Sequence, residues 1–500
     1  MKATKIFMMA ALALMTAACS NDDNEFAQQP QKAEGITITA QLAPKTNGAT
    51  TRAVSDGTDK IVAEWAENEH LAILYTVGST KKVADATITG VDGSGTATIS
   101  FSVDGGTTNG TPCTLVYPLS AAKDDHTGVK DATTLLAVQD GTLNANLDVR
   151  VGAGTIQTTT PGLTVTTQPA AQFAIWKLTL NNSAKDLYIT ADGVPIAGAI
   201  RSSAGTEFYV AVPAVDSKTV AVVATDGSSN CWSYSKASVS LATGNYYQSS
   251  PTMTALDGDN TKGVYKMTGA GTILAGKTVV LSDVTISSGS IICSGNATII
   301  LMGDNTVSAA QNQAAIKIGG SGTTLTITGS GSLTATGGSF CAGIGTDKAD
   351  DGTLSGGNIV INGGTVTATG GMTGAGIGTG RASNATNTCG DITINGGTVI
   401  AQGGANGGAG IGTGLSVQTS GTASNTCGAI TIGTGVISVT AKKSSSGNSG
   451  PNSIGKGRVA AGCNQACGTI TIGGTIYWDG TDYVGTGSTY LTQNSITYTP

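Results

Sequence analysis

The sequence predicts an all-β chain whose C-terminal half is a right-handed parallel β-helix. One pattern returns between residues 278 and 474, with equivalent isoleucines 34, 33, 38 and 40 residues apart. These isoleucines are Ile327, Ile361, Ile394, Ile432 and Ile472. Within each copy, β-branched apolar residues alternate with polar ones, which is the period of a strand and not of a helix. Glycine pairs stand where the backbone must turn a corner. Repeats of this kind bury their apolar faces only by stacking, as in a solenoid.

A second short motif, Gly-Ile-Gly, lies between the copies and supplies a third wall to each turn. The interior is therefore predicted to consist of ladders of Ile, Val and Ala, because equivalent residues of stacked turns lie above one another. The predicted inward ladder includes Ile361, Val366, Ile377, Ile394, Val399, Ile411, Ile432 and Ile472.

The first residues predict an exported lipoprotein. Two lysines precede an apolar run that is too short to span a bilayer, so residues 1–18 form a signal peptide. The stretch that ends at Cys19 resembles the lipobox of bacterial lipoproteins, which implies cleavage before Cys19 and lipid on its sulfur. Residues 19–33 form a tether, whose acidic start resembles the surface-export signal of Bacteroidetes lipoproteins. This implies a lipid-anchored protein exposed on the cell outer membrane; a polar tether with periplasmic retention is the alternative.

Composition excludes one class of function. The 500-residue chain has 73 glycines, 12% charged residues and a net charge of −6. Nucleic-acid binders need a concentrated basic surface for their phosphate contacts, so no nucleic-acid partner is expected. The length exceeds one ordinary domain, and two or three are expected.

Four stretches before residue 255 resemble a known family. They combine aromatic residues with apolar strands and lie at 61–75, 174–180, 207–213 and 241–247. Their order resembles the fimbrillin-like proteins of Bacteroidales, a family of lipoprotein-derived pilins and adhesins. The resemblance implies two successive transthyretin-like β-sandwich modules, at residues 34–150 and 151–255.

The distribution of aromatic residues marks the end of these modules. Trp65, Trp176 and Trp232 precede residue 250, whereas Phe340 is the only aromatic residue between Lys266 and Ile476. A sandwich needs bulky side chains between its sheets, while a narrow solenoid is packed by stacked aliphatic residues. We place the β-helix repeats at 263–480. Residues 481–500 are a C-terminal strand or cap, which closes the last turn or donates a strand to a partner.

The family resemblance also marks Arg52. Many pilins of this family are cleaved after an arginine in this region, which implies a groove opened for strand exchange with a partner fimbrial subunit. The alternative is an exposed arginine in a linker.

An enzyme is the main competing class. The repeats resemble those of pectate lyases, which implies a calcium site of clustered aspartates with a nearby base. Among the acids of the solenoid only Asp347, Asp350 and Asp351 group together, so they are a weak calcium candidate against a solvated loop. Both histidines lie outside the repeats, so no catalytic residue and no cofactor is predicted. Residues 271–278 match GxxxxGK[ST], but a strand pattern follows where a phosphate site needs a helix.

Cysteines and basic residues form two further ladders. Cys389, Cys427 and Cys467 each precede an inward strand, which predicts a buried thiol ladder; pairing of Cys463 with Cys467 is the alternative. Equivalent positions after the Gly-Ile-Gly motif hold Lys348, Arg381, Leu415 and Arg458. We hypothesise that the three basic residues form a ridge that binds an acidic host or dietary glycan, against the alternative of solvated loop charges.

Together these patterns predict a surface lipoprotein of structural and adhesive type, in which the β-helix is a display or ligand-binding module. A non-catalytic carbohydrate-binding protein is the second candidate. An extracellular polysaccharide lyase is the third.

Overall fold

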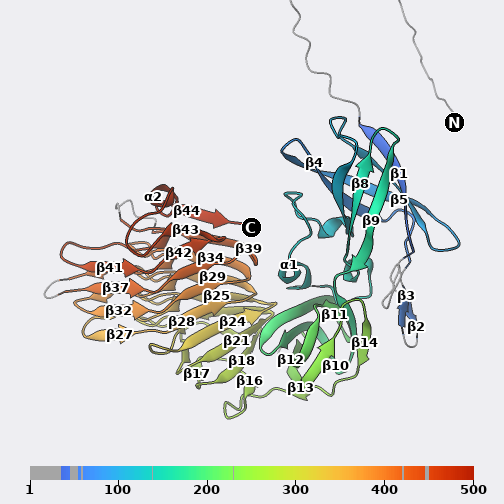
Figure 1. Cartoon of the computed structure of the whole chain (residues 1–500). Coiled ribbons are helices and arrows are strands. Elements are labelled where there is room, and N and C mark those ends of the chain that lie inside the picture. Colours follow the sequence, from blue (N-terminus) through green and yellow to red (C-terminus); the bar gives the residue numbers. More distant parts are fainter. Residues whose placement is uncertain are drawn as a thin grey trace, which may run out of the picture.

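The structure is a computed structural model that describes residues 35–44, 55–57, 60–62, 64–137, 139–228, 230–418, 422–444 and 450–500. It contains two β modules followed by a rod of stacked strands (Figure 1). Cys19 and Arg52 lie outside the described residues, so lipid attachment and cleavage stay predictions. Within the described ranges, no helix combines the length and apolarity needed to cross a bilayer.

The first module is one seven-stranded sheet in the order β1-β6-β5-β4-β7-β8-β9. Its strands are β1 Ile36–Leu42, β4 His70–Val77, β5 Thr80–Val91, β6 Ala97–Val103, β7 Thr111–Tyr117, β8 Arg150–Gln157 and β9 Gly162–Ala171. Alternate residues of the strands share one apolar cluster on one face of the sheet, whereas Ala72, Leu74 and Val116 belong to a second cluster on the other face. In the first cluster Trp65 donates from Nε1 to the Ala43 carbonyl at 3.0 Å and meets the Tyr117 ring edge-on. A short hairpin, β2 Ser55–Gly57 and β3 Lys60–Val62, pairs separately.

The predicted border at residue 150 between the two modules is wrong. β8 pairs antiparallel with β7 and β9 pairs with β8, so both strands complete the first sheet. The segment before β8 contains η1 Leu119–Ala121, α1 Ala132–Ala137 and η2 Ala145–Leu147. In the sequence, such a long connection looks like a linker between two modules. Only the hydrogen bonds of the ladder show that the chain returns to the same sheet.

The second module is built on two unusually long strands. Its elements are β10 Ala174–Ala191, β11 Val194–Val212, β12 Val215–Thr225, β13 Cys231–Leu241, β14 Tyr246–Ser249 and β15 Thr254–Ala255. The first part of β10 pairs with β14 and the last part with β12, with register shifts between Thr179 and Asp186. This irregular stretch lets one strand serve both sides of a separate apolar core. The transthyretin-like topology of the modules stays a prediction.

The rod is a parallel β-helix with three long walls, as predicted. The first wall contains β16 Val264–Lys266, β18 Lys277–Ser282, β21 Ala297–Met302, β24 Thr324–Gly329, β28 Asn358–Ile361, β33 Ile392–Ile394, β38 Ile430–Ile432, β42 Ile470–Ile472 and the antiparallel β43 Thr475–Trp478. The second wall contains β17 Gly271–Ile273, β20 Ile291–Cys293, β23 Ile316–Lys317, β26 Ile344–Gly345, β30 Ile377–Gly378, β35 Ile411–Gly412 and β40 Ile454–Gly455. The third wall contains β19 Thr285–Ile286, β22 Asp304–Ser308, β25 Ser332–Thr336, β29 Thr365–Thr369, β34 Gly397–Gln402, β39 Val436–Lys442 and β44 Ser495–Tyr498.

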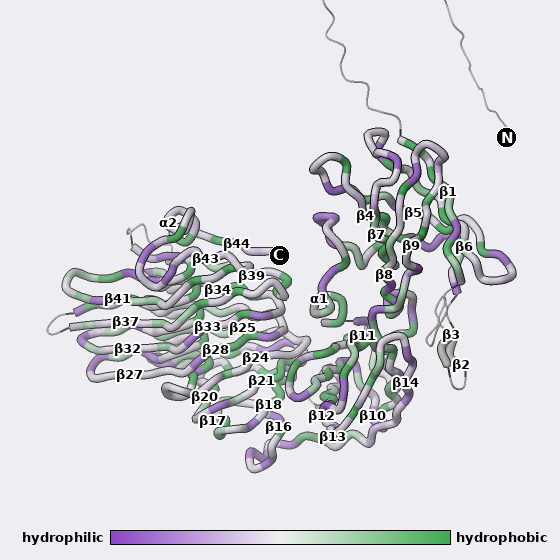
Figure 2. The backbone as a smooth tube through the Cα atoms, in the orientation of Figure 1, coloured by the Kyte–Doolittle hydropathy of each residue, from purple (hydrophilic) through white to green (hydrophobic). Residues whose placement is uncertain are grey.

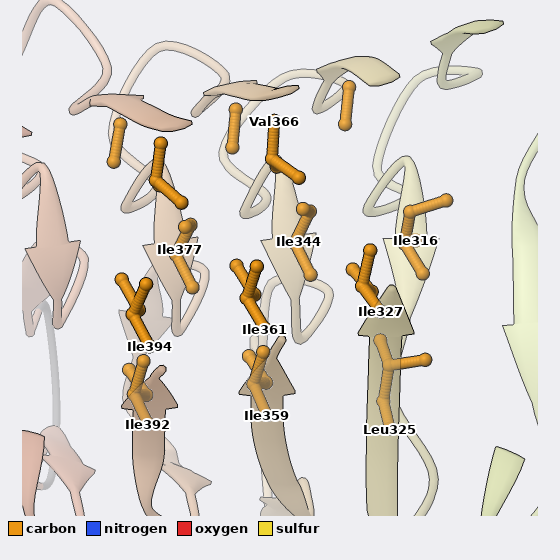
Figure 3. Packing of buried hydrophobic residues seen from close by; sticks show 14 of the residues in the cluster. Ile316, Leu325, Ile327, Ile344, Ile359, Ile361, Val366, Ile377, Ile392 and Ile394 are labelled. Atoms are coloured by element: carbon orange, nitrogen blue, oxygen red, sulfur yellow. The ribbon is translucent and has the colours of Figure 1, made fainter. Parts of the chain in front are cut away.

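The predicted inward ladder is confirmed. All eight predicted residues are buried, with exposed fractions of 0 to 2%, and belong to one continuous core. Figure 3 shows Ile344 and Ile377 in one row and Ile361 and Ile394 in another, with Val366 beside them. Figure 2 shows hydrophobic residues along the stacked strands of the rod and more hydrophilic residues in the loops.

The turns of the rod lengthen toward the C-terminus. Paired residues of the first wall are 20 residues apart at Val279 and Ile299, 34 at Ile327 and Ile361, and 40 at Ile432 and Ile472. The added residues enter after the second wall and form arms at 346–357, 379–390, 413–428, of which the structure describes 413–418 and 422–428, and 456–468. The arms stack into a fourth wall of β27 Thr353–Ser355, β32 Thr386–Cys389, β37 Ser424–Cys427 and β41 Asn464–Cys467, and into the pair β31 Ala382–Ser383 and β36 Ser416–Val417.

The C-terminal segment caps the rod. After β43 the chain forms α2 Gly487–Tyr490 and then β44, which pairs antiparallel with β39. Leu491 and Ile496 enter the core of the rod, with exposed fractions of 0% and 2%. The segment was predicted either to close the last turn or to donate a strand to a partner. In the structure it closes the last turn.

The second module packs directly on the start of the rod. Tyr188 and Val223 of the module share an apolar cluster with Val280, Ile300 and Met302 of the first wall. The Thr225 and Ser282 hydroxyls lie 3.0 Å apart, and the Ser330 hydroxyl donates to the Asp186 carboxylate at 2.8 Å. This contact fixes the rod against the modules through both apolar and polar groups.

Candidate functional site

The arms bring the predicted basic ladder into register. The Ala349 amide donates to the Arg381 carbonyl at 2.8 Å, the next turn repeats this contact from Ala382 to Leu415 at 3.0 Å, and Ser416 repeats it to Arg458 at 3.0 Å. The residues Lys348, Arg381, Leu415 and Arg458, which we call the ridge, therefore occupy equivalent places on four turns. Their predicted role in glycan binding stays a prediction.

The first two basic residues of the ridge surround the ring of Phe340. The Arg381 guanidinium lies 4.3 Å from the centroid of the Phe340 ring and the Lys348 ammonium 5.9 Å from it. Such cation–π contacts orient a cation over the ring face. The Arg381 amide donates to the Phe340 carbonyl at 2.7 Å, so the backbone fixes the same pair.

Asp350 joins these two cations. It accepts from Arg381 Nη2 at 2.7 Å and forms an ion pair with Lys348. The hydrogen bond from Lys348 holds the pKa of the Asp350 carboxyl below its usual value; Arg381 adds to this effect, and burial opposes it. Because the two cations share one anion and are only 20 to 23% exposed, much of their charge is already compensated.

Arg458 stands apart from this cluster. Within the described residues it has no ion pair, and its side chain runs along Gly407 and Gly450. Leu415 separates it from Arg381 on the ridge, so the structure brings Lys348 and Arg381 together but not all three basic residues.

The weak calcium candidate is not assembled. Asp347 pairs with Lys317 at 2.7 Å and accepts from the Ala314 amide at 2.7 Å, while Asp350 pairs with Lys348 and Arg381. Asp351 is exposed on the arm. In the described part of the chain, no three His, Cys, Asp or Glu side chains converge in a way that could hold a metal ion. Asp347 and Asp350, which are grouped with Asp351 in the sequence, serve as partners for separate cations.

A polar clamp that the sequence analysis missed holds the arms to the rod. Buried Thr346 donates to Asn387 Oδ1 at 2.8 Å, and Asn387 Nδ2 donates to the Asp347 carbonyl at 2.9 Å. Two turns on, Thr413 donates to Gln465 Oε1 at 3.1 Å. The signal was present as Asn or Gln two residues before each ladder cysteine, but its partner lies about forty residues away in sequence.

The ladder cysteines are stacked and buried as predicted. Cys389, Cys427 and Cys467 pair in register on β32, β37 and β41, with exposed fractions of 5%, 1% and 4%. Burial raises the pKa of Cys389 to about 12. Cys463 is partly exposed, and its Sγ faces the Ala461 carbonyl at 4.0 Å, so the structure does not pair it with Cys467.

The stretch 271–278 lies on β17, a turn and the start of β18. It therefore precedes a strand of the first wall and not a helix, which agrees with the strand pattern in the sequence.

Comparisons with known proteins agree with the fold of the rod. A family model described as a beta helix repeat matches residues 325–347, 359–381 and 392–415. The C-terminal half carries beta helix repeats. The matched residues contain the predicted glycine and isoleucine motifs. Each matched range starts on a first-wall strand of a turn that bears an arm.

Solved structures similar to this chain come from Bacteroidales. One is a fimbrial protein from Bacteroides ovatus, at 10% identity and a TM-score of 0.26, covering 43% of this chain and 49% of that one. Another is a protein assigned to cell adhesion from Bacteroides uniformis, at 10% identity and a TM-score of 0.25, covering 45% and 98%. A third is a fimbrial assembly protein from Parabacteroides distasonis, at 13% identity and a TM-score of 0.25, covering 44% and 92%. The chain spans about half the length of the first of these. No curated protein matches the chain.

Proposed function

We propose that the chain is a surface-exposed, lipid-anchored protein with a structural and adhesive role. Two β modules precede the β-helix, and the stacked arms of the β-helix display the ridge. The observation that carries this proposal is the clamped stack of arms, because loops that are hydrogen-bonded turn by turn present a fixed surface.

The placement of charge supports a display role over a catalytic one. Lys317, Lys348 and Arg381 of the rod are each paired with an aspartate, so these groups stabilise the arms. Hydrolysis or elimination needs an acid or base free to exchange a proton with the substrate. The paired groups of the ridge are poorly suited to that task.

Carbohydrate binding is the second candidate, and one feature favours it. At the start of the ridge, Lys348 and Arg381 form a cluster with the Phe340 ring and the Asp350 carboxylate. Sugars are bound by such mixtures of an apolar face and charged hydrogen-bonding groups. The partly compensated charge of the cluster suits a ligand with few negative charges better than a densely acidic one.

One experiment separates these functions. Purified residues 20–500 are applied to a glycan array, beside an absorbance assay for unsaturated uronate products. Binding without product supports a carbohydrate-binding protein, and product formation supports a polysaccharide lyase. If neither occurs, recovery of fimbrial subunits in a pull-down from the cell surface supports the structural and adhesive role, and failure to recover them contradicts it.

The ridge itself is tested with matched variants. Replacing Lys348, Arg381 and Arg458 with Ser removes its three cations, whereas replacing exposed Lys81, Lys218 and Lys236 with Ser removes three cations elsewhere. A ridge that binds glycan loses retention in the first variant alone. Equal retention by both variants contradicts glycan binding at the ridge.

The anchor and the partner are tested in cells. A Cys19→Ala variant is expected to leave the membrane fraction, and surface biotinylation of intact cells is expected to label the unmodified protein. Arg52→Ala is expected to block maturation and the exchange of a strand with a fimbrial partner. An unchanged mass of the mature protein in the Arg52→Ala variant contradicts cleavage at this position.

A further inference from the structure

Two cysteines of the arm wall lie unusually close together. Cys427 ends β37, Cys467 ends β41, and the two residues are paired in register. Their Sγ atoms are 2.6 Å apart. Sulfur atoms that merely touch stay farther apart than this, so the side chains already point directly at each other.

The backbone at this place meets the requirement of a disulfide. In-register residues on neighbouring strands stand about 4.8 Å apart. A disulfide accepts a Cα separation of about 4.4 to 6.8 Å. The two thiols therefore need only a small side-chain rotation, and no movement of the strands, to bond.

The neighbouring cysteines do not share this arrangement. Cys389 is in register with Cys427 on the other side, but its Sγ faces the Gly357 carbonyl at 3.6 Å. Cys463 faces the Ala461 carbonyl and is partly exposed. Among these four cysteines, geometry selects one pair.

We propose that the exported chain carries a disulfide bond between Cys427 and Cys467. This inference rests on the proposed location outside the cytoplasm, where such bonds form and persist. One thiolate attacks a disulfide of the cell envelope, or glutathione disulfide in vitro, and releases one thiol. The second cysteine then displaces the other thiol, so two electrons and two protons pass to the acceptor and the Sγ–Sγ bond forms.

Burial determines when the bond forms and how long it lasts. Both cysteines are buried in the core of the rod, and Trp478 donates from Nε1 to the Cys467 carbonyl at 3.1 Å. Their oxidation therefore belongs to folding, before the arms close. Once formed, the bond joins two successive turns next to the C-terminal cap and resists reductants that cannot enter the folded rod.

The test uses residues 20–500 produced in an oxidising compartment, or refolded with glutathione disulfide. Free thiols are alkylated in denaturant without reduction, and the chain is cleaved on the amino side of Asp391, which separates Cys389 from Cys427. Mass spectrometry is expected to find one linkage, which survives in a Cys389→Ala, Cys463→Ser double variant and is lost in Cys467→Ser. The folded chain is expected to keep the bond in dithiothreitol and to lose it in denaturant.

Stability supplies an independent measure. The protein is reduced in denaturant and refolded without oxidant. This treatment is expected to lower the unfolding temperature of the wild type by several degrees. The unfolding temperature of the Cys427→Ser, Cys467→Ser double variant is expected to stay unchanged. Full alkylation of both cysteines before reduction overturns the proposal, and so does linkage of Cys389 or Cys463 instead. The bond is measured in purified protein, independently of adhesion. Its absence would therefore not contradict the adhesive role, and a failure of adhesion would not contradict the disulfide.

Discussion

Four glycines occupy the same place on consecutive turns of the rod: Gly345, Gly378, Gly412 and Gly455. They pair in register and have φ angles between +116° and +144°, which side chains rarely adopt. A Cβ on Gly378 would lie 1.8 Å from the carbonyl oxygen of Gly412. At this corner, one turn can stack on the next only if both lack a side chain.

A Gly378→Ala substitution is therefore expected to prevent the rod from folding, because the backbone of the next turn cannot move aside. The measurement is the soluble yield and the denaturation midpoint of the purified chain. Gly322→Ala is the control, since Gly322 has φ of +79° but nothing within 4 Å of its added Cβ. This control is expected to lose only about 1 kcal/mol. Equal behaviour of the two variants would contradict the close stacking.

Asn387 allows a second test at the residue scale. It is fully buried and bonds to Thr346 and to the Asp347 carbonyl, so Asn387→Leu leaves the Thr346 hydroxyl without its acceptor and the Asp347 carbonyl without the Asn387 donor. We expect a loss of about 3 kcal/mol in the free energy of unfolding. Thr386→Val, one residue away on the outer face of the same strand, is expected to change it by less than about 0.5 kcal/mol. Urea denaturation checks both, and a tolerated Asn387→Leu would show that the clamp is dispensable.

At the scale of elements, the C-terminal cap closes a surface that would otherwise attract other strands. β44 covers the edge of β39, and Leu491 fills the end of the core. An unpaired edge beside exposed apolar residues favours association with other chains.

Removal of residues 485–500 is thus expected to produce oligomers or aggregates, because it uncovers both β39 and the core. Light scattering coupled to size-exclusion chromatography measures this. Removal of only Thr499 and Pro500, which lie beyond β44, is the control and is expected to leave the elution unchanged. A truncated chain that elutes like the intact one would contradict the capping role of α2 and β44.

At the scale of the whole molecule, the junction between the second module and the rod contains a buried acid. Burial raises the pKa of Asp186 from 3.8 to about 6, although the hydrogen bond from Ser330 acts in the opposite direction. The folded state thus binds the proton more tightly than the unfolded state. The resulting stability is present below about pH 4 and is lost as the pH rises through about 6.

Asp186→Asn is expected to abolish this dependence, because the amide carries no charge at any pH. Between pH 4 and pH 7 the wild type is expected to lose about 2.4 kcal/mol relative to the variant. Urea denaturation at a series of pH values measures the difference. Asp351→Asn, at an exposed position on an arm, is the control and is expected to keep the wild-type profile. Parallel profiles of Asp186→Asn and wild type would contradict the assignment.

The sequence alone determined the solenoid, its three walls and the residues that fill it. These features follow from local repetition: glycine at each corner and alternating Ile and Val on each wall leave one way to bury the apolar face. Ile361, Ile394 and Ile432 were predictable because each turn imposes the same requirement on the next.

Only the tertiary structure decided the features that join distant residues. The membership of β8 and β9 in the first sheet, the clamp between Thr346 and Asn387 and the capping by β44 all depend on hydrogen bonds between segments far apart in the chain. The cluster around Phe340 likewise arises because residues from two turns meet where their arms begin. Sequence periodicity sets the spacing of the turns, but the contacts between turns, arms and modules are set by how those turns pack in space.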